Sequence, residues 1–261
     1  MKSLKTVLCL AIPLGCILTA GCGIFGGEPE KPADISLNVL EKRMHKAMDP
    51  TGAYRNAQSY VQKQMLEIKR DWSGKKSFIV EVKFKRPDLF KTTTIEDNRK
   101  KDAVIFNGKK AWLVDYRNKQ VIPIKGTKFE KLKVLFSIGR PDSTYEDVFK
   151  KVVVTETTID NKPYYKLLCI SKIKEQDPIS IYVGKNNFLT KRLETIERIN
   201  GRPEKYISTI DKYTMHDGVM IPAETTVQLD NVKQKSIVIL YKLNAKIKDS
   251  EFKPPTFINA N

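Results

Sequence analysis

Residues 78–85 read Phe-Ile-Val-Glu-Val-Lys-Phe-Lys, with an apolar side chain at every second position and charged residues at three of the positions between. A period of two, with one apolar and one charged face, is typical of an antiparallel strand that is covered on one side only. The preceding segment alternates in the same way at Leu66, Ile68 and Trp72, and residues 73–75 provide a turn signal between the two. Together these segments predict a β-hairpin.

Strand-like segments with turn signals between them continue through most of the remaining chain. The strongest of these signals is Asn107-Gly108, a dipeptide typical of two-residue hairpin turns. The further predicted strands are residues 89–95, 103–106, 111–116, 120–124, 151–158, 164–173, 179–183, 188–199, 204–213, 219–229 and 235–243. The fold class is therefore mainly β (α+β), with about eleven antiparallel strands, and a sheet of this width is expected to curl or split.

Two segments have helical spacing instead. The first follows a possible cap at Asp34 or Ser36, and Asp49-Pro50-Thr51-Gly52 ends it. Its apolar residues are Val39, Leu40, Met44, Ala47 and Met48. The second runs from Phe129 to Ile138 and interrupts the series of strands. We expect the curled sheet to pack against one or two helices.

The N-terminus has the features of a signal peptide, which we predict for residues 1–21. Lys2 and Lys5 precede a charge-free and mostly apolar stretch that is too short for a membrane-spanning helix. The stretch ends in Leu-Thr-Ala-Gly at 18–21, directly before Cys22, and resembles a bacterial lipobox. In a lipobox the cysteine is acylated and becomes the first residue of the mature protein. The alternative is a plain signal peptide that is cut elsewhere, with Cys22 as an ordinary thiol.

Cleavage at this site would define three parts of the chain. Removal of 21 of the 261 residues leaves 240, enough for one large domain. Residues 22–33 contain several Gly, Pro and Glu residues and are expected to form a tether behind the acylated cysteine. Residues 34–261 are then predicted to form a single folded domain. Cys169, in an apolar run, is the one cysteine left in that domain and is expected to be a small core residue.

The chain is strongly basic, with a formal net charge of +17, of which Lys2 and Lys5 would leave with the signal peptide. A high pI favours nucleic acid as a partner in general, but an exported lipoprotein rarely meets nucleic acid. Basic residues close to an anionic membrane are attracted by about 1 kcal/mol each. The third interpretation is a lysine-rich, solvated surface. The lysines are spread along the whole chain, so we expect no nucleic-acid partner, and charge alone does not identify another.

The sequence contains no motif for catalysis, for a metal or for a cofactor. Its two histidines are His45, on the polar side of the first predicted helix, and His216, in a turn before Asp217-Gly218. Neither histidine accompanies a G-x-S-x-G, C-x-x-C or H-E-x-x-H pattern, and glycine-rich phosphate loops are absent. The sequence therefore predicts a protein that is not an enzyme, without cofactors and without a metal site.

A broad apolar face on a curved sheet is the better candidate for function, because sites for acyl chains need apolar surface with few polar anchors. The residues that could line such an acyl-binding cavity are Leu66, Ile68, Trp72, Phe78, Val80, Val82, Phe84 and Trp112. The second helical segment could act as a movable cover over it, through Leu132, Leu135 and Phe136. The alternative is that these apolar residues form an ordinary core.

Several segments resemble the LolA/LolB-like lipoprotein carriers. Residues 84–90 (Phe-Lys-Arg-Pro-Asp-Leu-Phe) are similar to a strand end of that family, and residues 106–115 (Phe-Asn-Gly-Lys-Lys-Ala-Trp-Leu-Val-Asp) are similar to its following hairpin. Residues 213–222 (Tyr-Thr-Met-His-Asp-Gly-Val-Met-Ile-Pro) resemble a stretch of outer membrane lipoprotein-sorting proteins. The resemblance extends from about residue 40 to residue 255, and the segments occur in the same order and at similar spacing.

This resemblance implies an unclosed, curved antiparallel β-barrel wrapped around helices, with an apolar concavity that holds the acyl chains of lipoproteins or lipids. Because Cys22 would anchor the chain to a membrane, the chain is more similar to an anchored acceptor or lipid-binding lipoprotein than to a soluble shuttle. Gly23 follows Cys22 in place of the Asp that retains lipoproteins in the inner membrane of enteric bacteria. The expected location is therefore the outer membrane, facing the periplasm. The alternative function is an envelope sensor or scaffold that binds a protein partner.

Overall fold

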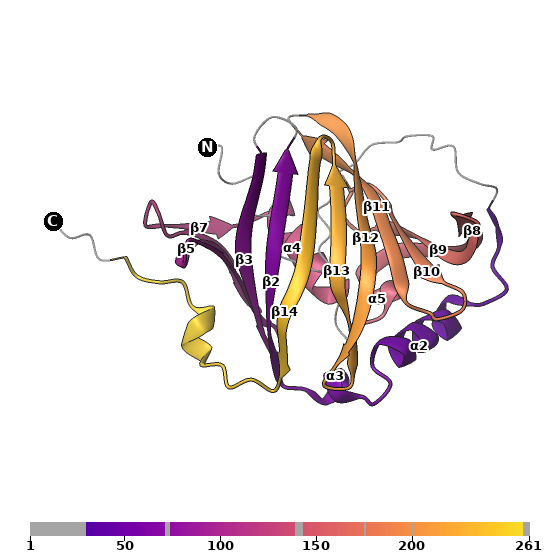
Figure 1. The fold of residues 1–261 in the computed structure, drawn as a ribbon, viewed down its shortest axis with the longest axis horizontal. Helices are drawn as coiled ribbons and strands as arrows, with labels where there is room; N and C mark the ends of the chain where they lie inside the picture. The colour runs from indigo at the N-terminus through magenta and orange to yellow at the C-terminus, as the bar shows by residue number, and fades with distance from the viewer. Residues whose placement is uncertain (1–29, 71–73, 139–142, 175, 200, 258–261) are drawn as a thin grey trace.

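The structure is a computed structural model that describes residues 30–70, 74–138, 143–174, 176–199 and 201–257. Within these residues all strands belong to one antiparallel sheet of fourteen strands, which curves around a concave face (Figure 1). The strands are β1 (Lys31–Pro32), β2 (Ser59–Arg70), β3 (Gly74–Lys85), β4 (Leu89–Glu96), β5 (Arg99–Asn107), β6 (Ala111–Asp115), β7 (Gln120–Ile124), β8 (Phe149–Ile159), β9 (Lys162–Ser171), β10 (Ile179–Gly184), β11 (Thr190–Ile199), β12 (Arg202–His216), β13 (Val219–Leu229) and β14 (Val232–Leu243).

The strand order is β1-β8-β9-β10-β11-β12-β13-β14-β2-β3-β4-β5-β6-β7, which is two meanders joined by the pairing of β14 with β2. The two ends of this order, β7 and β1, do not pair with each other, so the barrel stays unclosed. The predicted fold class is confirmed. The expected count of about eleven strands is too low, because each of the thirteen strand-like segments in the sequence forms a strand of its own, β2 to β14. One addition is β1, whose two residues are too few to show an alternating pattern and lie at the end of the segment expected to be a tether.

The helices are α2 (Leu37–Met48), α3 (Ala53–Asn56), α4 (Thr127–Ile138), α5 (Tyr145–Val148) and the 3-10 helix η1 (Asp249–Phe252). Both helical segments predicted from the sequence are present as α2 and α4. The single turn α5 is too short for a periodic pattern, and a capping box between Thr144 and Asp147 closes its N-terminus. The buried carboxylate of Glu41 on α2 accepts a hydrogen bond of 2.6 Å from the backbone N–H of Tyr145, which ties α2 to α5.

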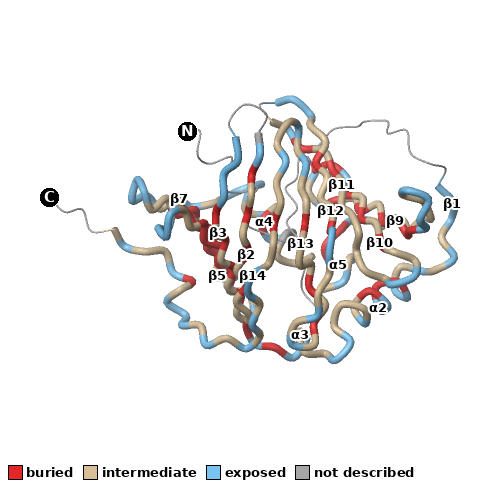
Figure 2. The backbone as a smooth tube through the Cα atoms, viewed as in Figure 1, coloured by how far each residue is buried: buried red, intermediate tan, exposed pale blue. Residues whose placement is uncertain are grey.

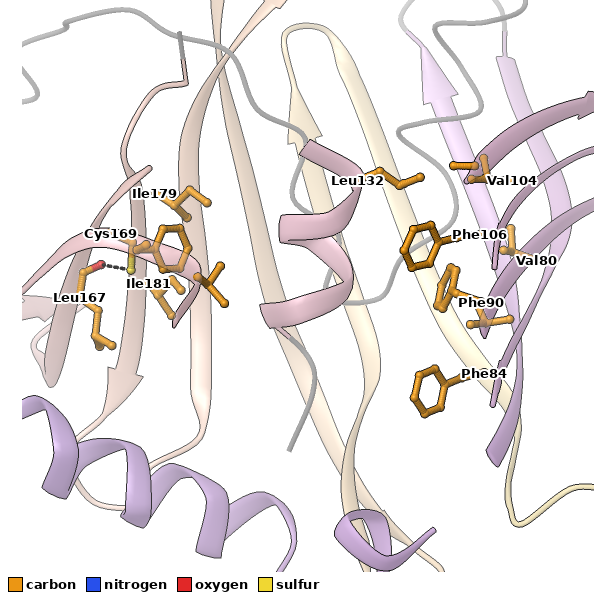
Figure 3. Close-up of a cluster of buried hydrophobic side chains, with 14 of the residues drawn as sticks. Val80, Phe84, Phe90, Val104, Phe106, Leu132, Leu167, Cys169, Ile179 and Ile181 are labelled. Atoms are coloured by element: carbon orange, nitrogen blue, oxygen red, sulfur yellow. Dashed lines mark hydrogen bonds between the residues drawn. The ribbon is translucent and has the colours of Figure 1, made fainter. Parts of the chain in front are cut away.

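The main core lies on the concave face of the sheet. On β3 the buried positions are Phe78, Val80, Val82 and Phe84, which confirms the alternation in the sequence. Helix α4 lies between two walls of the curved sheet, with Phe84, Phe90 and Phe106 on one wall and Cys169, Ile179 and Ile181 on the other (Figure 3). Cys169 is completely buried, as expected for a core residue.

A smaller core covers part of the convex face. Ala103, Ile105 and Val114 are buried there, and Trp112, Tyr116, Val121 and Phe257 pack against them. Strands β4 and β5 therefore have buried residues on both faces. Red segments mark buried backbone in the region of β3, β5 and β7 in Figure 2. The C-terminal segment that includes η1 extends along this face, and its Phe252 is 1% exposed.

Candidate functional site

The concave face contains a partly open cavity with a volume of about 180 Å³. Its walls come from α2 and the segment after it, from β2 to β5, from the C-terminal end of α4, from α5, and from β13 and β14. The cavity is larger than an engineered protein cavity of about 150 Å³ that holds benzene, and close-packed interiors contain few voids of this kind. A second pocket, of about 440 Å³, is lined largely by polar residues of the turn around Lys185, Asn186 and Asn187. The cavity on the concave face is the candidate site because its lining is mainly apolar.

A row of aromatic side chains crosses the floor of the cavity. Tyr60, Phe84, Phe90 and Phe106 are direct partners in the register of four neighbouring strands, β2 to β5. The rings of Tyr60 and Phe84 stack with their centroids 5.3 Å apart, and the ring of Tyr241 on β14 stacks on Tyr60 at 5.8 Å. We call these five residues the aromatic row. All five line the cavity, so the row provides one continuous apolar strip across five strands.

Helix α4 forms a second wall beside the phenylalanine end of the row. The ring centroid of Phe136 is 4.1 Å from that of Phe90 and 5.1 Å from that of Phe106. Phe136, Ser137 and Ile138 all line the cavity. The last turn of α4 therefore closes this end of the cavity with mostly apolar side chains.

Polar groups gather at the opposite end, near α2 and α3. The carboxylate of Asp49 accepts hydrogen bonds from the backbone N–H groups of Tyr54 (3.1 Å) and Arg55 (2.9 Å), which fixes the loop between the two helices. His45 also lines the cavity and is half-buried, although it is on the polar side of the predicted helix. Burial lowers the pKa of its imidazole, which favours the neutral form of the ring.

Two hydroxyl groups and one amide also reach the cavity at this end. Burial raises the pKa values of Tyr60 and Tyr241 well above their ordinary range, so both phenols stay protonated and can donate a hydrogen bond. Gln62, on the concave face of β2, lines the cavity and donates a 3.3 Å hydrogen bond through Nε2 to Oε1 of Gln64. Both glutamines are buried, so β2 presents amide groups on a face that is otherwise apolar.

The structure brings only some of the sequence-predicted cavity residues to the cavity itself. Val82 and Phe84 line it. Four more belong to the same buried core but lie outside the cavity lining: Leu66, Ile68, Phe78 and Val80. Trp112 packs against the smaller core on the convex face, and Trp72 lies outside the described residues. The role of these residues in binding an acyl chain stays a prediction.

The predicted cover residues also have different positions. Phe136 lines the cavity, whereas Leu132 is 4% exposed and belongs to the main core. The side chain of Leu135 is not among those that the structure describes. Because α4 lies between the two walls of the sheet, it is an inner wall of the cavity in this structure (Figure 3). Its movement as a cover stays a prediction, as does the acylation of Cys22, which is also outside the described residues.

Sequence analysis missed most of the aromatic row. Phe90, Phe106 and Tyr241 are in predicted strands, but no single strand indicates which residues of its neighbours are opposite. Tyr60 precedes the first predicted strand, in a segment expected to form a helical turn, whereas the structure places it in β2. The signal is the strand register, because pairing of β2 to β5 brings one aromatic residue from each strand into line. Both the strand order and the register are needed to find the row.

Among the described residues, no group of three or more His, Cys, Asp or Glu side chains could hold a metal ion. None of the helices in the described ranges is both long and apolar enough to cross a bilayer.

Comparison of the sequence with protein-family models and with curated proteins found no match. Comparison of the structure with solved structures found similar folds. A LolA superfamily protein of Nitrosomonas europaea has a TM-score of 0.61 and 14% identity, and the match covers 84% of this chain and 98% of the other. The chain has the LolA-like fold.

Two further structures have this fold over a similar length. A DUF1329 family protein of Desulfovibrio piger matches with a TM-score of 0.58 and 13% identity, over 83% of this chain and 97% of the other. A Vibrio parahaemolyticus domain described as an outer membrane lipoprotein-sorting protein matches with a TM-score of 0.56 and 14% identity, over 83% and 95%. The unclosed LolA-like sheet predicted from short sequence segments is thus present over most of the chain.

Proposed function

We propose that this chain is a lipid-anchored protein of the cell envelope that binds acyl chains of lipoproteins or lipids in its concave cavity, without catalysing a reaction on them. The observation that carries the proposal is the cavity of about 180 Å³, which crosses an otherwise well-packed concave face. Burial of an acyl chain there would be favoured by about 0.8 kcal/mol for each methylene group. The LolA-like fold supports this proposal, since one structure with the fold is described as a lipoprotein-sorting protein.

The alternative from the sequence is an envelope sensor or scaffold that binds a protein partner and whose concavity is filled. The open space beside the aromatic row favours lipid binding over this alternative, because a filled concavity would leave no such volume. We propose the outer membrane, with the domain facing the periplasm, as the location of the protein. The supporting residues are the lipobox-like segment before Cys22 and the glycine that follows it.

The proposal is tested by measuring how a fluorescent acyl probe binds to the Cys22→Ser variant. This substitution removes the protein's own acyl chains, which could otherwise compete with the probe for the cavity. Ser137→Trp places an indole into the cavity from the last turn of α4, while Lys133→Trp places the same indole on the exposed side of that helix. We expect saturable probe binding that Ser137→Trp weakens at least about tenfold and Lys133→Trp leaves unchanged, because only the first indole occupies the binding volume. Equal binding by both variants would place the acyl site elsewhere, and no binding by the parent protein would contradict the proposed function.

A further inference from the structure

The size of the cavity limits how many acyl chains it can hold. The cavity of 180 Å³ is only slightly larger than an engineered protein cavity of about 150 Å³ that holds one benzene molecule. It therefore has room for part of one acyl chain and has no room for a second chain beside it.

The aromatic row gives the cavity a direction. From β14 to β5 its members are Tyr241, Tyr60, Phe84, Phe90 and Phe106, so the hydroxyl groups are all at one end. Neighbouring strands are about 4.8 Å apart, so the four steps from β14 to β5 span about 19 Å. That length suits one extended acyl chain lying across the strands.

The remaining lining follows the same direction. Gln62 and His45 line the cavity at the end of the tyrosines. At the other end the rings of Phe90 and Phe106 contact the ring of Phe136 on α4, and Phe106 also contacts the ring of Phe129. Phenol and amide N–H groups donate hydrogen bonds to carbonyl oxygens. Arg55, the cationic side chain of this end, is exposed at the rim. The polar end thus provides uncharged donors inside the cavity, while the carboxylate of Asp49 is engaged by the backbone N–H groups of Tyr54 and Arg55.

We propose that the ligand is a monoacyl lipid, one acyl chain joined through an ester or amide carbonyl to a polar group, bound with its carbonyl at Tyr60 and Tyr241 and its tail at Phe106 and Phe136. This inference rests on the proposed function and adds to it the number of chains and their direction. The polar group lies at the rim beside Arg55, and the tail is enclosed between β5 and α4.

The number of chains is tested by native mass spectrometry of the Cys22→Ser protein with palmitoyl-lysophosphatidylcholine or dipalmitoyl-phosphatidylcholine, which share a headgroup and a chain. We expect a 1:1 complex with the one-chain lipid and at least about tenfold weaker binding of the two-chain lipid. Equal occupancy by the two-chain lipid would overturn the inference but leave the proposed function standing. Absence of binding by either lipid and by the fluorescent acyl probe would count against both.

The direction is tested by photo-crosslinking with two palmitoyl-lysophosphatidylcholine probes, one with a diazirine near the carbonyl and one with a diazirine at the end of the chain. We expect the first to label peptides that contain Tyr60 or Tyr241, and the second to label peptides that contain Phe106 or Phe136. The reversed pattern, or the same pattern from both probes, would overturn the proposed direction.

A variant pair tests the carbonyl contact without a large change in shape. Tyr60→Phe combined with Tyr241→Phe keeps both rings and removes both hydroxyl groups, and loss of one or two neutral hydrogen bonds is expected to weaken binding about five- to tenfold. Tyr116→Phe is the matched control, because Tyr116 packs against Phe257 on the convex face. Unchanged affinity in the double variant, with an unchanged melting temperature, would show that the hydroxyls do not contact the ligand.

Discussion

Glu197 is the residue with the most unusual position on the concave side of β11. It is 7% exposed, and its Oε1 atom has no hydrogen-bond partner among the described residues. Burial raises the pKa of this carboxyl to about 7, Lys131 on α4 opposes the rise, and Asp177 adds to it. A buried acid with a raised pKa prefers its neutral form, because the ionised form is desolvated.

This position predicts a pH-dependent contribution to stability. The pKa of Glu197 lies near 4.5 in the unfolded chain, so between about pH 4.5 and pH 7 the folded state binds more protons than the unfolded state. The free energy of unfolding therefore falls as the pH rises through this window, by up to about 3 kcal/mol in total. Glu197→Gln keeps the shape and stays neutral, so we expect it to stabilise the protein at pH 8 and to have little effect at pH 4.5.

Urea unfolding at the two pH values measures this difference. Glu146→Gln, at an exposed position of α5, is the control and should change the free energy of unfolding by less than about 0.5 kcal/mol at either pH. If Glu197→Gln stabilised the protein equally at pH 4.5 and pH 8, folding would not raise the pKa of the Glu197 carboxyl, and the prediction would be wrong.

At the scale of elements, the C-terminal segment is held to the convex face by an ion-pair cluster. The carboxylate of Glu251 on η1 lies 2.9 Å from Nζ of Lys91 and 3.3 Å from Nζ of Lys83. The hydrogen bond from Lys91 is the largest cause that lowers the pKa of Glu251, to about 2, while partial burial acts in the opposite direction. Lys91 is itself buried, at 7% exposed, so its ammonium group depends on this partner.

Glu251→Gln is therefore expected to destabilise the protein at pH 7. Removal of one partner from a fully buried ion pair costs about 3–5 kcal/mol, and the partial exposure of Glu251 reduces our expectation to about 1–2 kcal/mol. Because the pKa of this acid is lowered by folding, the stabilisation is present above about pH 4.5 and is lost as the pH falls towards 2.

The neighbouring ion pair of Lys85 with Asp249 supplies a matched control, since Asp249 is largely exposed. Thermal unfolding at pH 7 should show a lower melting temperature for Glu251→Gln and almost no change for Asp249→Asn. Equal effects of the two variants would mean that burial of Lys91 does not depend on Glu251.

The sequence predicts features that depend on residues close together in the chain, and it does not predict features that depend on contacts between distant segments. Helices α2 and α4 and the strands follow from local spacing, as the buried positions of β3 show. The aromatic row and the placement of Trp112 on the convex face do not, because each depends on which strands pair and on which face of the sheet receives the C-terminal segment. Single-turn α5 and two-residue β1 carry too few residues for any periodicity.

At the scale of the whole molecule, the proposed acyl anchor at Cys22 would attach a domain with a LolA-like fold to a membrane. We expect the mature protein to fractionate with outer membranes and to carry radiolabelled palmitate, because acyl chains hold it there. Cys22→Ser should abolish the label and release the protein into the soluble periplasmic fraction, if the precursor is still exported. Retention of the label, or of membrane association in high salt, would contradict acylation at Cys22 as the anchor.

The central claim is that the cavity beside the aromatic row holds an acyl chain. Native mass spectrometry of the Cys22→Ser protein, purified gently from its own envelope, tests this claim most directly. The account predicts an added mass that fits a lipid, disappears after organic extraction and is absent from the Ser137→Trp variant. A mass without any adduct, in a protein that also fails to take up an acyl probe, would contradict it.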